Sequence, residues 1–544
     1  MEMLNLSLPA TNRFASNYLQ QSAEVMSFFH YHFNDLDEDR VRLAELKNRN
    51  FPRERLADHI EHFMEQLPLT DAVRESLTKL RQPDSAVIIG GQQAGILTGP
   101  LYSIHKVISI IKLAQQKEKQ LGVPVVPVFW IAGEDHDFQE VNHVFVPMEG
   151  KVDKWTYPKK LMQKKMVSDI QLDGSMCLGW VENLIENFGE TEHTNELLEF
   201  ARRLVNKSNT FVDFFAGIIM ELFKDHGLLL VDSGDPQFRL LQKEFLTNQI
   251  DNHEAITFSL HEQQKEIENN GFPITIEGSE YAANLFYYDK QSNERILLEF
   301  DRKTDRFVGK SGRVTFSKQE LLEIAAANPE KLSNNVVTRP LMQEWLFPTL
   351  AFIAGPGEIA YWAELKLVFE HFQIKMPPIV PRLNITFLDR SVETDLTDLR
   401  LNLGNVLQRG SAQEKQQFLN SIKDQEIEAL FHQVKEQFVS QYEIIEAKTS
   451  ALDKGLVPLV QKNEKNILRE IDFMQSKLQE SVRQKHEVVL NKFARIDLAL
   501  RPGDSPQERV WNVFYYLNHF GLNFINELMT LNFEFDGTHK VIKL

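Results

Sequence analysis

Short apolar runs that end in glycine or an acidic residue recur along the chain, at 86–89, 125–131, 227–232 and 350–354. Runs of this length are typical of buried strands in a parallel sheet. After the first run, apolar residues recur at helical spacing from Ile104 to Ile111. Strand, glycine loop and helix, followed by a second strand, predict a right-handed βαβ unit. The pattern therefore predicts an α/β fold with a parallel sheet.

Changes in this pattern also predict where the parts of the chain begin and end. The stretch 271–316 alternates in strand fashion and indicates a small antiparallel appendage. We expect an N-terminal helical segment that packs on the core (1–85), an α/β core (86–390) with insertions (about 150–225 and 260–330), a helical arm (391–500) and a C-terminal segment that returns to the core (501–544).

The arm is rich in Lys, Glu and Gln. Ile427, Phe431, Val434 and Phe438 begin an apolar series with four-then-three spacing, and a second series begins at Ile467. Gly455 and Pro458 lie between the two series. Two such helices joined by a turn predict an antiparallel coiled-coil hairpin. The alternative is a pair of helices that lie flat on the core.

Composition narrows the class of protein. The chain has 544 residues, of which 42% are hydrophobic and 25% charged, as in a soluble protein of two or three domains. Its net charge of -17 argues against nucleic acid as a partner. The single cysteine, Cys177, excludes an intramolecular disulfide and a zinc site built from several thiolates. No apolar run has the length of a membrane span, so we expect a cytoplasmic protein without membrane contact.

The first candidate site follows the first predicted strand. Its loop contains Gly95, Gly99 and Pro100, and His105 and Lys106 lie in the first turn of the following helix. A strand, a glycine loop and a helix N-terminus present backbone N–H groups to an anion. A tight turn without a ligand is the alternative.

The second predicted strand ends in Glu134, Asp135, His136 and Asp137. Parallel strands joined by a crossover end at the same edge of the sheet, where ligands bind. We therefore expect these four residues to meet His105 in one crevice. Like charges so close together would raise their pKa values. The alternative is a solvated acidic cluster at a loop tip.

A third candidate, at 339–366, repeats the order of strand, glycine turn and helix. Gly355 and Gly357 form the turn, and Glu358 begins the helix. Arg339 and Glu358 are candidates for ligand binding, and a structural ion pair between them is the alternative. Near the C-terminus, Ser505 and Glu508 have the spacing of a capping box and predict a helix over 506–520.

Four segments together resemble the BshC family, the cysteine-adding enzymes of bacillithiol biosynthesis. They are GGQQAGILTGPLYSIHK (90–106), WIAGEDHDFQEVNH (130–143), RPLMQEWLFPTLAFIAGPGEIAYWAELK (339–366) and PQERVWN (506–512). The resemblance implies a Rossmann-like core with connecting insertions, and a coiled-coil arm that forms a homodimer. It also implies a ligase that joins the carboxylate of cysteine to the amine of glucosaminyl-malate, in the last step of bacillithiol biosynthesis.

The resemblance extends to class I nucleotidylyl transferases, which carry a histidine-rich signature after the first strand. His105 matches its last histidine, whereas Tyr102 stands where a first histidine is usual. The carboxylate of cysteine must be activated before it reacts with an amine. ATP or another nucleotide, with Mg²⁺, is therefore a candidate cofactor. We assign no residue of the protein as a metal ligand. The expected catalytic residues are His105, Asp135 and His136, and the expected binding residues are Gln92, Gly99, Lys106, Glu134, Asp137, Arg339, Gly355, Gly357, Glu358 and Trp511.

Two other functional classes stay open at this point. The first is a nucleotidylyl transferase or amino-acid ligase that acts on another small molecule, for which the same residues would serve. The second is a coiled-coil interaction protein with a vestigial nucleotide fold. Nucleotide binding distinguishes the second class from the enzymes.

Overall fold

The parallel sheet predicted from the apolar runs is present in the structure, a computed structural model that describes residues 1–148, 150–160, 165–310 and 312–544. Five strands pair in the order β13-β12-β2-β3-β6, and all the pairs are parallel. Their bounds are β2 Ala86–Gln92, β3 Val125–Ile131, β6 Leu229–Asp232, β12 Thr349–Ala354 and β13 Ile379–Pro381. Only β13 was missed, because it has three residues and lies among prolines.

The strand order makes the core Rossmann-like. The first strand of the sheet, β2, is central; β3 and β6 follow on one side, and β12 and β13 on the other. This is the order of a doubly wound fold, in which successive strands are added first on one side of the first strand and then on its other side. The switch point lies between β2 and β12, and ligands bind outside the carboxyl ends of the two strands there.

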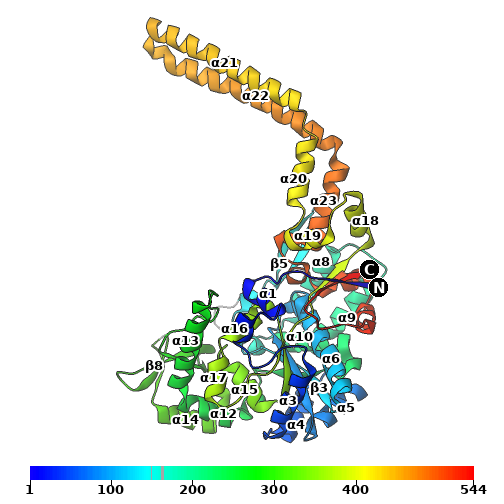
Figure 1. Cartoon of the computed structure of the whole chain (residues 1–544), viewed down its shortest axis with the longest axis vertical. Helices are drawn as coiled ribbons and strands as arrows, with labels where there is room; N and C mark the ends of the chain where they lie inside the picture. The colour runs from blue at the N-terminus through cyan, green and yellow to red at the C-terminus, as the bar shows by residue number, and fades with distance from the viewer. Residues whose placement is uncertain (149, 161–164, 311) are drawn as a thin grey trace. The chain divides into compact units, whose positions relative to one another are not determined.

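Helices cover the sheet (Figure 1). Helix α6 (Tyr102–Leu121) packs on β2 and β3, and most of its residues are buried. Helices α4 (Arg53–Phe63) and α5 (Asp71–Arg81) pack on β6 and β3, and α3 (Leu36–Lys47) packs on β12. The N-terminal segment also contains α1 (Arg13–Leu19) and α2 (Ala23–Met26). Along the chain, α15 (Arg339–Leu346) precedes β12, and α16 (Pro356–Ala363) and α17 (Lys366–His371) follow it.

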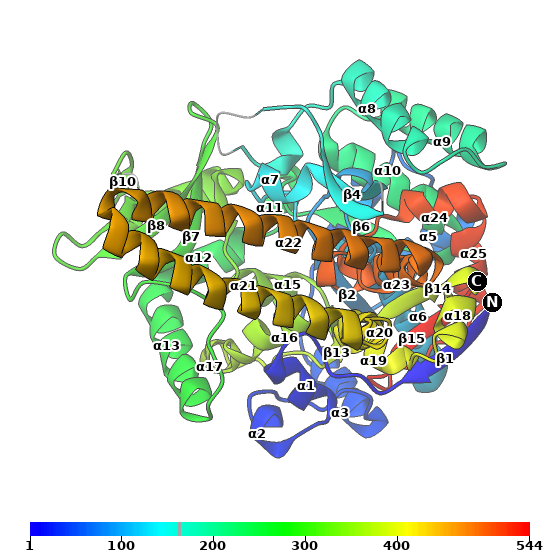
Figure 2. The ribbon, with the colours of Figure 1, turned by 90° about the horizontal axis from the view of Figure 1, so that it is seen from above.

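The sequence had predicted a helical segment over 1–85, but this segment also contains a strand. Strand β1 (Glu2–Leu6) pairs antiparallel with β15 (His539–Lys543), and β14 (Ile385–Leu388) completes a three-stranded sheet. The two ends of the chain therefore lie side by side (Figure 2). This pairing connects residues at opposite ends of the sequence, so no local pattern could reveal it.

Two insertions extend the core. The first contains the hairpin β4-β5 and helices α8 to α10, and the second a five-stranded antiparallel sheet in the order β10-β9-β8-β7-β11. Apolar residues of this second sheet pack against α12 and α14. The bounds are α7 Phe138–Val141, β4 His143–Met148, β5 Lys151–Thr156, α8 Gly174–Glu186, α9 Thr194–Lys207, α10 Phe211–Phe223, α11 Pro236–Leu240, α12 Lys243–Asp251, α13 His253–Asn269, β7 Ala282–Asp289, β8 Glu294–Asp301, β9 Arg306–Gly309, β10 Thr315–Phe316, α14 Lys318–Ala327 and β11 Leu332–Asn334.

The chain divides into two compact units, Met1–Phe387 with Gln507–Leu544, and Leu388–Pro506. The second unit contains α18 Arg390–Asp398, α19 Leu403–Arg409, α20 Ala412–Ser421, α21 Gln425–Leu452, α22 Val457–Lys485 and α23 Glu487–Leu500. Helices α21 and α22 lie side by side as an antiparallel hairpin, joined by a short turn that contains Gly455 (Figures 1 and 2). Among the described residues, no helix combines the length and the apolar character that a membrane span needs.

Candidate functional site

A cavity of about 420 Å³ lies at the switch point of the sheet. The ends of β2 and α6 supply one wall, and the turn between β12 and α16 supplies another. We call it the switch-point cavity. It brings together seven of the residues that were predicted from the sequence: Gln92, Lys106, Asp135, Arg339, Gly355, Gly357 and Glu358.

Lys106 is held at the floor of this cavity. Its Nζ donates to the Gly91 carbonyl at 2.6 Å and lies 2.5 Å from Glu358 Oε2. Burial lowers the pKa of Lys106, although the Glu358 carboxylate opposes this shift. The same carboxylate accepts from the Gly355 N–H at 2.7 Å and so caps α16. One carboxylate therefore connects the helix after β2 with the turn after β12.

Arg339 enters the cavity from the start of α15. Its guanidinium donates to Gln343 Oε1 at 3.2 Å and to the Tyr361 hydroxyl at 3.1 Å. It also lies 5.8 Å from the centre of the Trp130 ring, within reach of a cation–π interaction. The alternative of an ion pair between Arg339 and Glu358 is wrong within the described structure, because Glu358 pairs with Lys106 instead.

Among the cavity residues that were not predicted from the sequence are Tyr102, Arg382 and Arg509. The guanidinium carbons of Arg382 and Arg509 lie 5.6 and 5.9 Å from the centre of the Tyr102 ring. Tyr102 had been noted only as a departure from the histidine signature, and it supports two arginines here. The sequence carried no signal for Arg382, because β13, the strand that this residue directly follows, was itself missed.

The cavity is consequently basic. Of its described lining residues, Lys106, Arg339, Arg382 and Arg509 are cationic, whereas Asp135 and Glu358 are anionic. Glu358 offsets the charge of Lys106, and Glu508 offsets that of Arg382, so Arg339 and Arg509 face one remaining carboxylate, Asp135, among the described residues. A cavity with this balance favours anionic ligands, since a guanidinium binds carboxylate or phosphate through charge-assisted hydrogen bonds.

Asp135 is the one member of the acidic cluster that lines the cavity. It accepts from Gln93 Nε2 at 2.6 Å and from the His136 N–H at 2.7 Å. Burial raises its pKa, but these two hydrogen bonds and the charge of Arg295 lower it, and the net shift is downward. The predicted upward shift is therefore wrong for Asp135, because its hydrogen bonds stabilise the charged form.

The other three residues of the cluster lie elsewhere. Glu134 is buried with its Oε2 atom 3.7 Å from Arg239 Nη2 and 4.0 Å from Arg295 Nη2. Asp137 is exposed and caps α7 by accepting from the Gln139 N–H at 3.1 Å. The His136 ring lies edge-on to Phe286 and is not among the lining residues. The expectation that all four converge in one crevice is wrong, because the chain turns sharply after β3.

His105 does not face the cavity either. Its side chain is fully buried, its Nδ1 atom lies 3.4 Å from Glu508 Oε2, and its ring packs edge-on against Phe387 at 5.9 Å. Successive residues of a helix point about 100° apart. Lys106 and His105 therefore cannot both point into the cavity, and the expected place of His105 in the crevice is wrong.

Gly99 and Trp511 also stand outside the lining. The Gly99 carbonyl accepts from Asn512 Nδ2 at 2.6 Å, and the Trp511 carbonyl accepts from the Leu101 N–H at 2.8 Å. The Trp511 ring stacks on Tyr515 with 5.9 Å between centres. Both residues attach the C-terminal segment to the loop after β2, which corrects their expected role in ligand binding.

The C-terminal segment folds differently from the predicted capping box. A short turn at Gln507–Arg509 precedes helix α24 (Val513–Phe520), which Asn512 caps, and α25 (Phe524–Thr530) follows. Glu508 is buried and pairs with Arg382, with 2.5 Å between Oε1 and Nη2. Burial raises the pKa of Glu508, but Arg382 and His105 lower it to about 2. A distant arginine thus overrides the local capping pattern.

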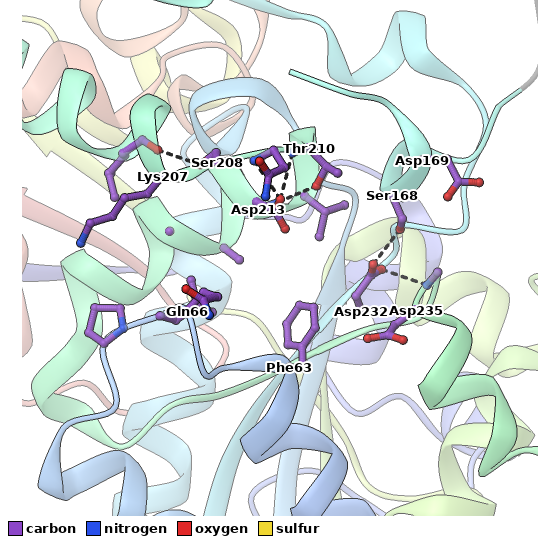
Figure 3. Close-up of a pocket in the computed structure, with 18 of the residues that line it drawn as sticks. Phe63, Gln66, Ser168, Asp169, Lys207, Ser208, Thr210, Asp213, Asp232 and Asp235 are labelled. Atoms are coloured by element: carbon purple, nitrogen blue, oxygen red, sulfur yellow. Dashed lines mark hydrogen bonds between the residues drawn. The ribbon is translucent and has the colours of Figure 1, made fainter. Parts of the chain in front are cut away.

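A second cavity, also of about 420 Å³, lies at the carboxyl end of β6 (Figure 3). Ser168 Oγ donates to Asp232 Oδ2 at 2.7 Å, and the Gly234 N–H donates to Oδ1 at 2.9 Å. Burial raises the pKa of Asp232 to about 7. On the far side, Asp213 accepts from the Thr210 N–H at 2.9 Å and completes the capping box of α10. These carboxylates are already bonded within the chain, so we assign no ligand to this cavity.

The described side chains supply neither a reactive thiolate nor a ready-made metal site. Cys177 is buried, and burial raises the pKa of its thiol to about 12, so it is not a thiolate at neutral pH. Over residues 1–148, 150–160, 165–310 and 312–544, no three His, Cys, Asp or Glu side chains gather as a metal-binding group. A divalent cation would depend on ligands that a substrate brings, such as phosphate oxygens.

Comparisons with known proteins agree over the whole chain. A family model described as "Bacillithiol biosynthesis BshC, N-terminal Rossmann-like domain" matches residues 1–383, and "Bacillithiol biosynthesis BshC, C-terminal coiled-coil domain" matches residues 385–544. Relatives named "Putative cysteine ligase BshC" come from Geobacillus thermodenitrificans (45% identical over 542 residues), Anoxybacillus flavithermus (42% over 545) and Bacillus cereus strain AH187 (41% over 544). Each alignment covers 100% of both chains.

Proposed function

Because this chain belongs to the bacillithiol biosynthesis BshC family, we propose that it is a ligase that adds cysteine to glucosaminyl-malate. The reaction forms an amide bond between the cysteine carboxylate and the amine of the sugar, and completes bacillithiol biosynthesis. The observation that carries the proposal is the basic cavity at the switch point, in a chain whose full-length relatives bear the name of a cysteine ligase. Its soluble substrates suit a cytoplasmic enzyme.

The charges of the cavity suit these substrates. Glucosaminyl-malate carries two carboxylates on its malate half, and cysteine carries one. Arg339, Arg382 and Arg509 supply donors for such groups. Among the described lining residues, Asp135 is the one carboxylate not paired with Lys106, and its lowered pKa keeps it charged. We therefore assign it to the amine of the acceptor, which it orients by charge and hydrogen bonding.

A carboxylate does not condense with an amine in water without activation. ATP or another nucleotide would supply a leaving group by forming an acyl phosphate or acyl-adenylate with cysteine, and Mg²⁺ would accompany its phosphates. The turn at Gly355 and Gly357 opens on the cavity; the Gly355 N–H is used by Glu358, and the Gly357 N–H in the first turn of α16 would suit phosphate. The amine then forms the C–N bond as the phosphate-bearing group departs, and the proton that the amine loses passes to water, while Asp135 accepts a hydrogen bond from the amine and holds it in place.

We further propose a homodimer formed through the arm. Neither α21 nor α22 buries a single described residue, although both carry an apolar series. Leu430, Ile444, Leu459 and Phe473 are 58%, 48%, 63% and 54% exposed. A two-helix hairpin leaves such side chains in water, and a second copy of the hairpin would cover them.

The test is a reaction of the purified protein with cysteine, glucosaminyl-malate and each nucleoside triphosphate in turn, followed by mass spectrometry. We expect the amide product with at least one nucleotide, together with a stoichiometric nucleotide product. Replacing the acceptor with glucosamine or with malate should abolish the product. A nucleotide adduct of a different small molecule would favour the nucleotidylyl transferase instead, and no reaction with any nucleotide would contradict the proposal.

A further inference from the structure

Glu508 is buried at the join of the C-terminal segment and the sheet, and both of its carboxylate oxygens are engaged. Oε1 lies 2.5 Å from Arg382 Nη2, and Oε2 lies 3.4 Å from His105 Nδ1. The side chains of Glu508 and Arg382 are 6% and 4% exposed, and that of His105 is 0% exposed. Three residues that lie far apart in the sequence thus form one buried group.

Within this group, the negative charge of Glu508 is offset by the positive charge of Arg382. Glu508 stays ionised because Arg382 and His105 lower its pKa against the effect of burial. Burial lowers the pKa of His105, so the ring is neutral at pH 7 and donates an N–H to Glu508 without adding charge. A buried ion pair is stable when its geometry is good and its remaining polar atoms are bonded. Both oxygens of Glu508 are engaged, which fixes this carboxylate and, through its short contact with Nη2, the guanidinium of Arg382.

Arg382 keeps donors for a ligand. Its Nη2 atom is used by Glu508 and by Asn384 Oδ1, at 3.1 Å. Its Nε atom is buried and therefore closed to a ligand in the cavity, whereas its Nη1 atom is not among the buried atoms and has no hydrogen-bond partner in the described part of the chain. The residue lines the switch-point cavity, and its guanidinium lies over the Tyr102 ring. An anion in the cavity would meet a guanidinium that is already oriented and does not have to be ordered on binding.

We propose that Glu508 and His105 are positioning residues that hold Arg382 in place to bind a carboxylate of the acceptor. This inference rests on the proposed function for the identity of the acceptor, but the geometry of the group does not. It gives His105 a role different from the catalytic one that the sequence suggested. It also gives the return of the C-terminal segment to the core a role, because this segment supplies Glu508, the ion-pair partner of Arg382.

The direct test is Glu508→Gln, which keeps the size of the side chain and removes its charge. We expect the KM for glucosaminyl-malate to rise at least about tenfold, the effect of losing one charge-assisted hydrogen bond, with a change in kcat of less than about threefold. His105→Phe keeps the ring and removes the donor, and should raise the same KM by a smaller factor. The KM for cysteine should change in neither variant.

The matched control is Asp39→Asn. Asp39 pairs with Lys117 at 2.5 Å in the same compact unit, and the two side chains are 6% and 4% exposed, as in the pair of Glu508 and Arg382. This variant loses a buried ion pair away from the cavity, so the melting temperature should fall while the KM stays unchanged. If Asp39→Asn raised the KM as much as Glu508→Gln, general destabilisation would explain the effect and the positioning role would be wrong.

Two readouts do not depend on turnover. Calorimetry with L-malate as the probe should show weaker binding to Glu508→Gln than to the native protein. The Nε–H signal of Arg382 in a ¹⁵N-arginine NMR spectrum, assigned with Arg382→Lys, should broaden in Glu508→Gln. An unchanged signal together with unchanged malate affinity would overturn the inference. A native protein that forms no product while both readouts respond would contradict the proposed function alone.

Discussion

Lys106 and Glu358 form an ion pair, with 2.5 Å between Nζ and Oε2, that spans the switch point of the sheet. The lysine follows β2 and the glutamate follows β12, so the pair connects the two strands beside which the order reverses. The charge of Lys106 is therefore already offset inside the protein. Attraction for an anionic ligand comes mainly from the arginines around the cavity, which corrects the emphasis that the sequence placed on Lys106.

The two partners of this pair are not equivalent, because the Lys106 side chain is 2% exposed and that of Glu358 is 23% exposed. Glu358→Gln would leave a buried ammonium without a counter-charge, at a cost of about 3 kcal/mol. Lys106→Met leaves a carboxylate that water reaches and that still accepts from Gly355. Urea unfolding should therefore show the larger loss of stability in Glu358→Gln. Equal losses would mean that Lys106 is less buried than the structure shows.

Gly357→Ala separates stability from activity. A Cβ at Gly357 would meet no atom within 4 Å, and the residue lies in the first turn of α16 beside the cavity. Alanine is the better helix former by about 1 kcal/mol, so the melting temperature should stay level or rise. If the space belongs to a ligand, kcat/KM should fall at least about tenfold, or 1.4 kcal/mol.

Gly179 provides the matched control for that variant. It lies within α8, away from the cavity, and a Cβ there would also meet nothing within 4 Å. Gly179→Ala should stabilise the protein to a similar degree and leave kcat/KM unchanged. Full activity in both variants would show that no ligand occupies the space beside Gly357.

Glu508 should contribute to acid sensitivity. The pKa of Glu508 is about 2 in the folded protein, against an ordinary value of 4.5, so the unfolded chain binds the proton more readily. The stabilisation is complete above pH 4.5 and is lost as the pH falls toward 2. Between pH 5 and pH 3 the native protein should lose about 2 kcal/mol from this group. The loss measured by urea unfolding should be smaller by that amount in Glu508→Gln, and identical pH profiles would contradict the prediction.

Removing the hairpin tests the proposed dimer. Replacing α21 to α22 (425–485) with a short glycine-serine linker leaves both ends of the arm in place and deletes the exposed apolar residues. We expect a dimer for the full chain and a folded monomer for the shortened one in light scattering. Leu430→Lys with Leu459→Lys should have the same effect without a deletion. A shortened chain that remains dimeric would place the interface elsewhere.

Local patterns predicted much of the fold. The runs at 86–89, 125–131, 227–232 and 350–354 were found as strands because a buried parallel strand is a short, continuous apolar segment. The two helices of the arm and the turn at Gly455 were found because a long helix repeats its apolar positions many times. Strands β1 and β13 were missed, since each is short and gains its order from a partner distant in the sequence.

The candidate site was likewise predicted in part from local patterns, and the rest of it depends on residues that are distant in the sequence. The sequence alone determined which edge of the sheet carries it, because crossover connections fix the direction of the strands, and so it found Gln92, Arg339 and the turn from Gly355 to Glu358. Only the tertiary structure decided which neighbouring side chain points inward: Lys106 and not His105, and Asp135 and not His136. It also decided that Arg382 and Arg509 complete the cavity, because packing brings together chain segments whose separation along the sequence carries no signal of contact.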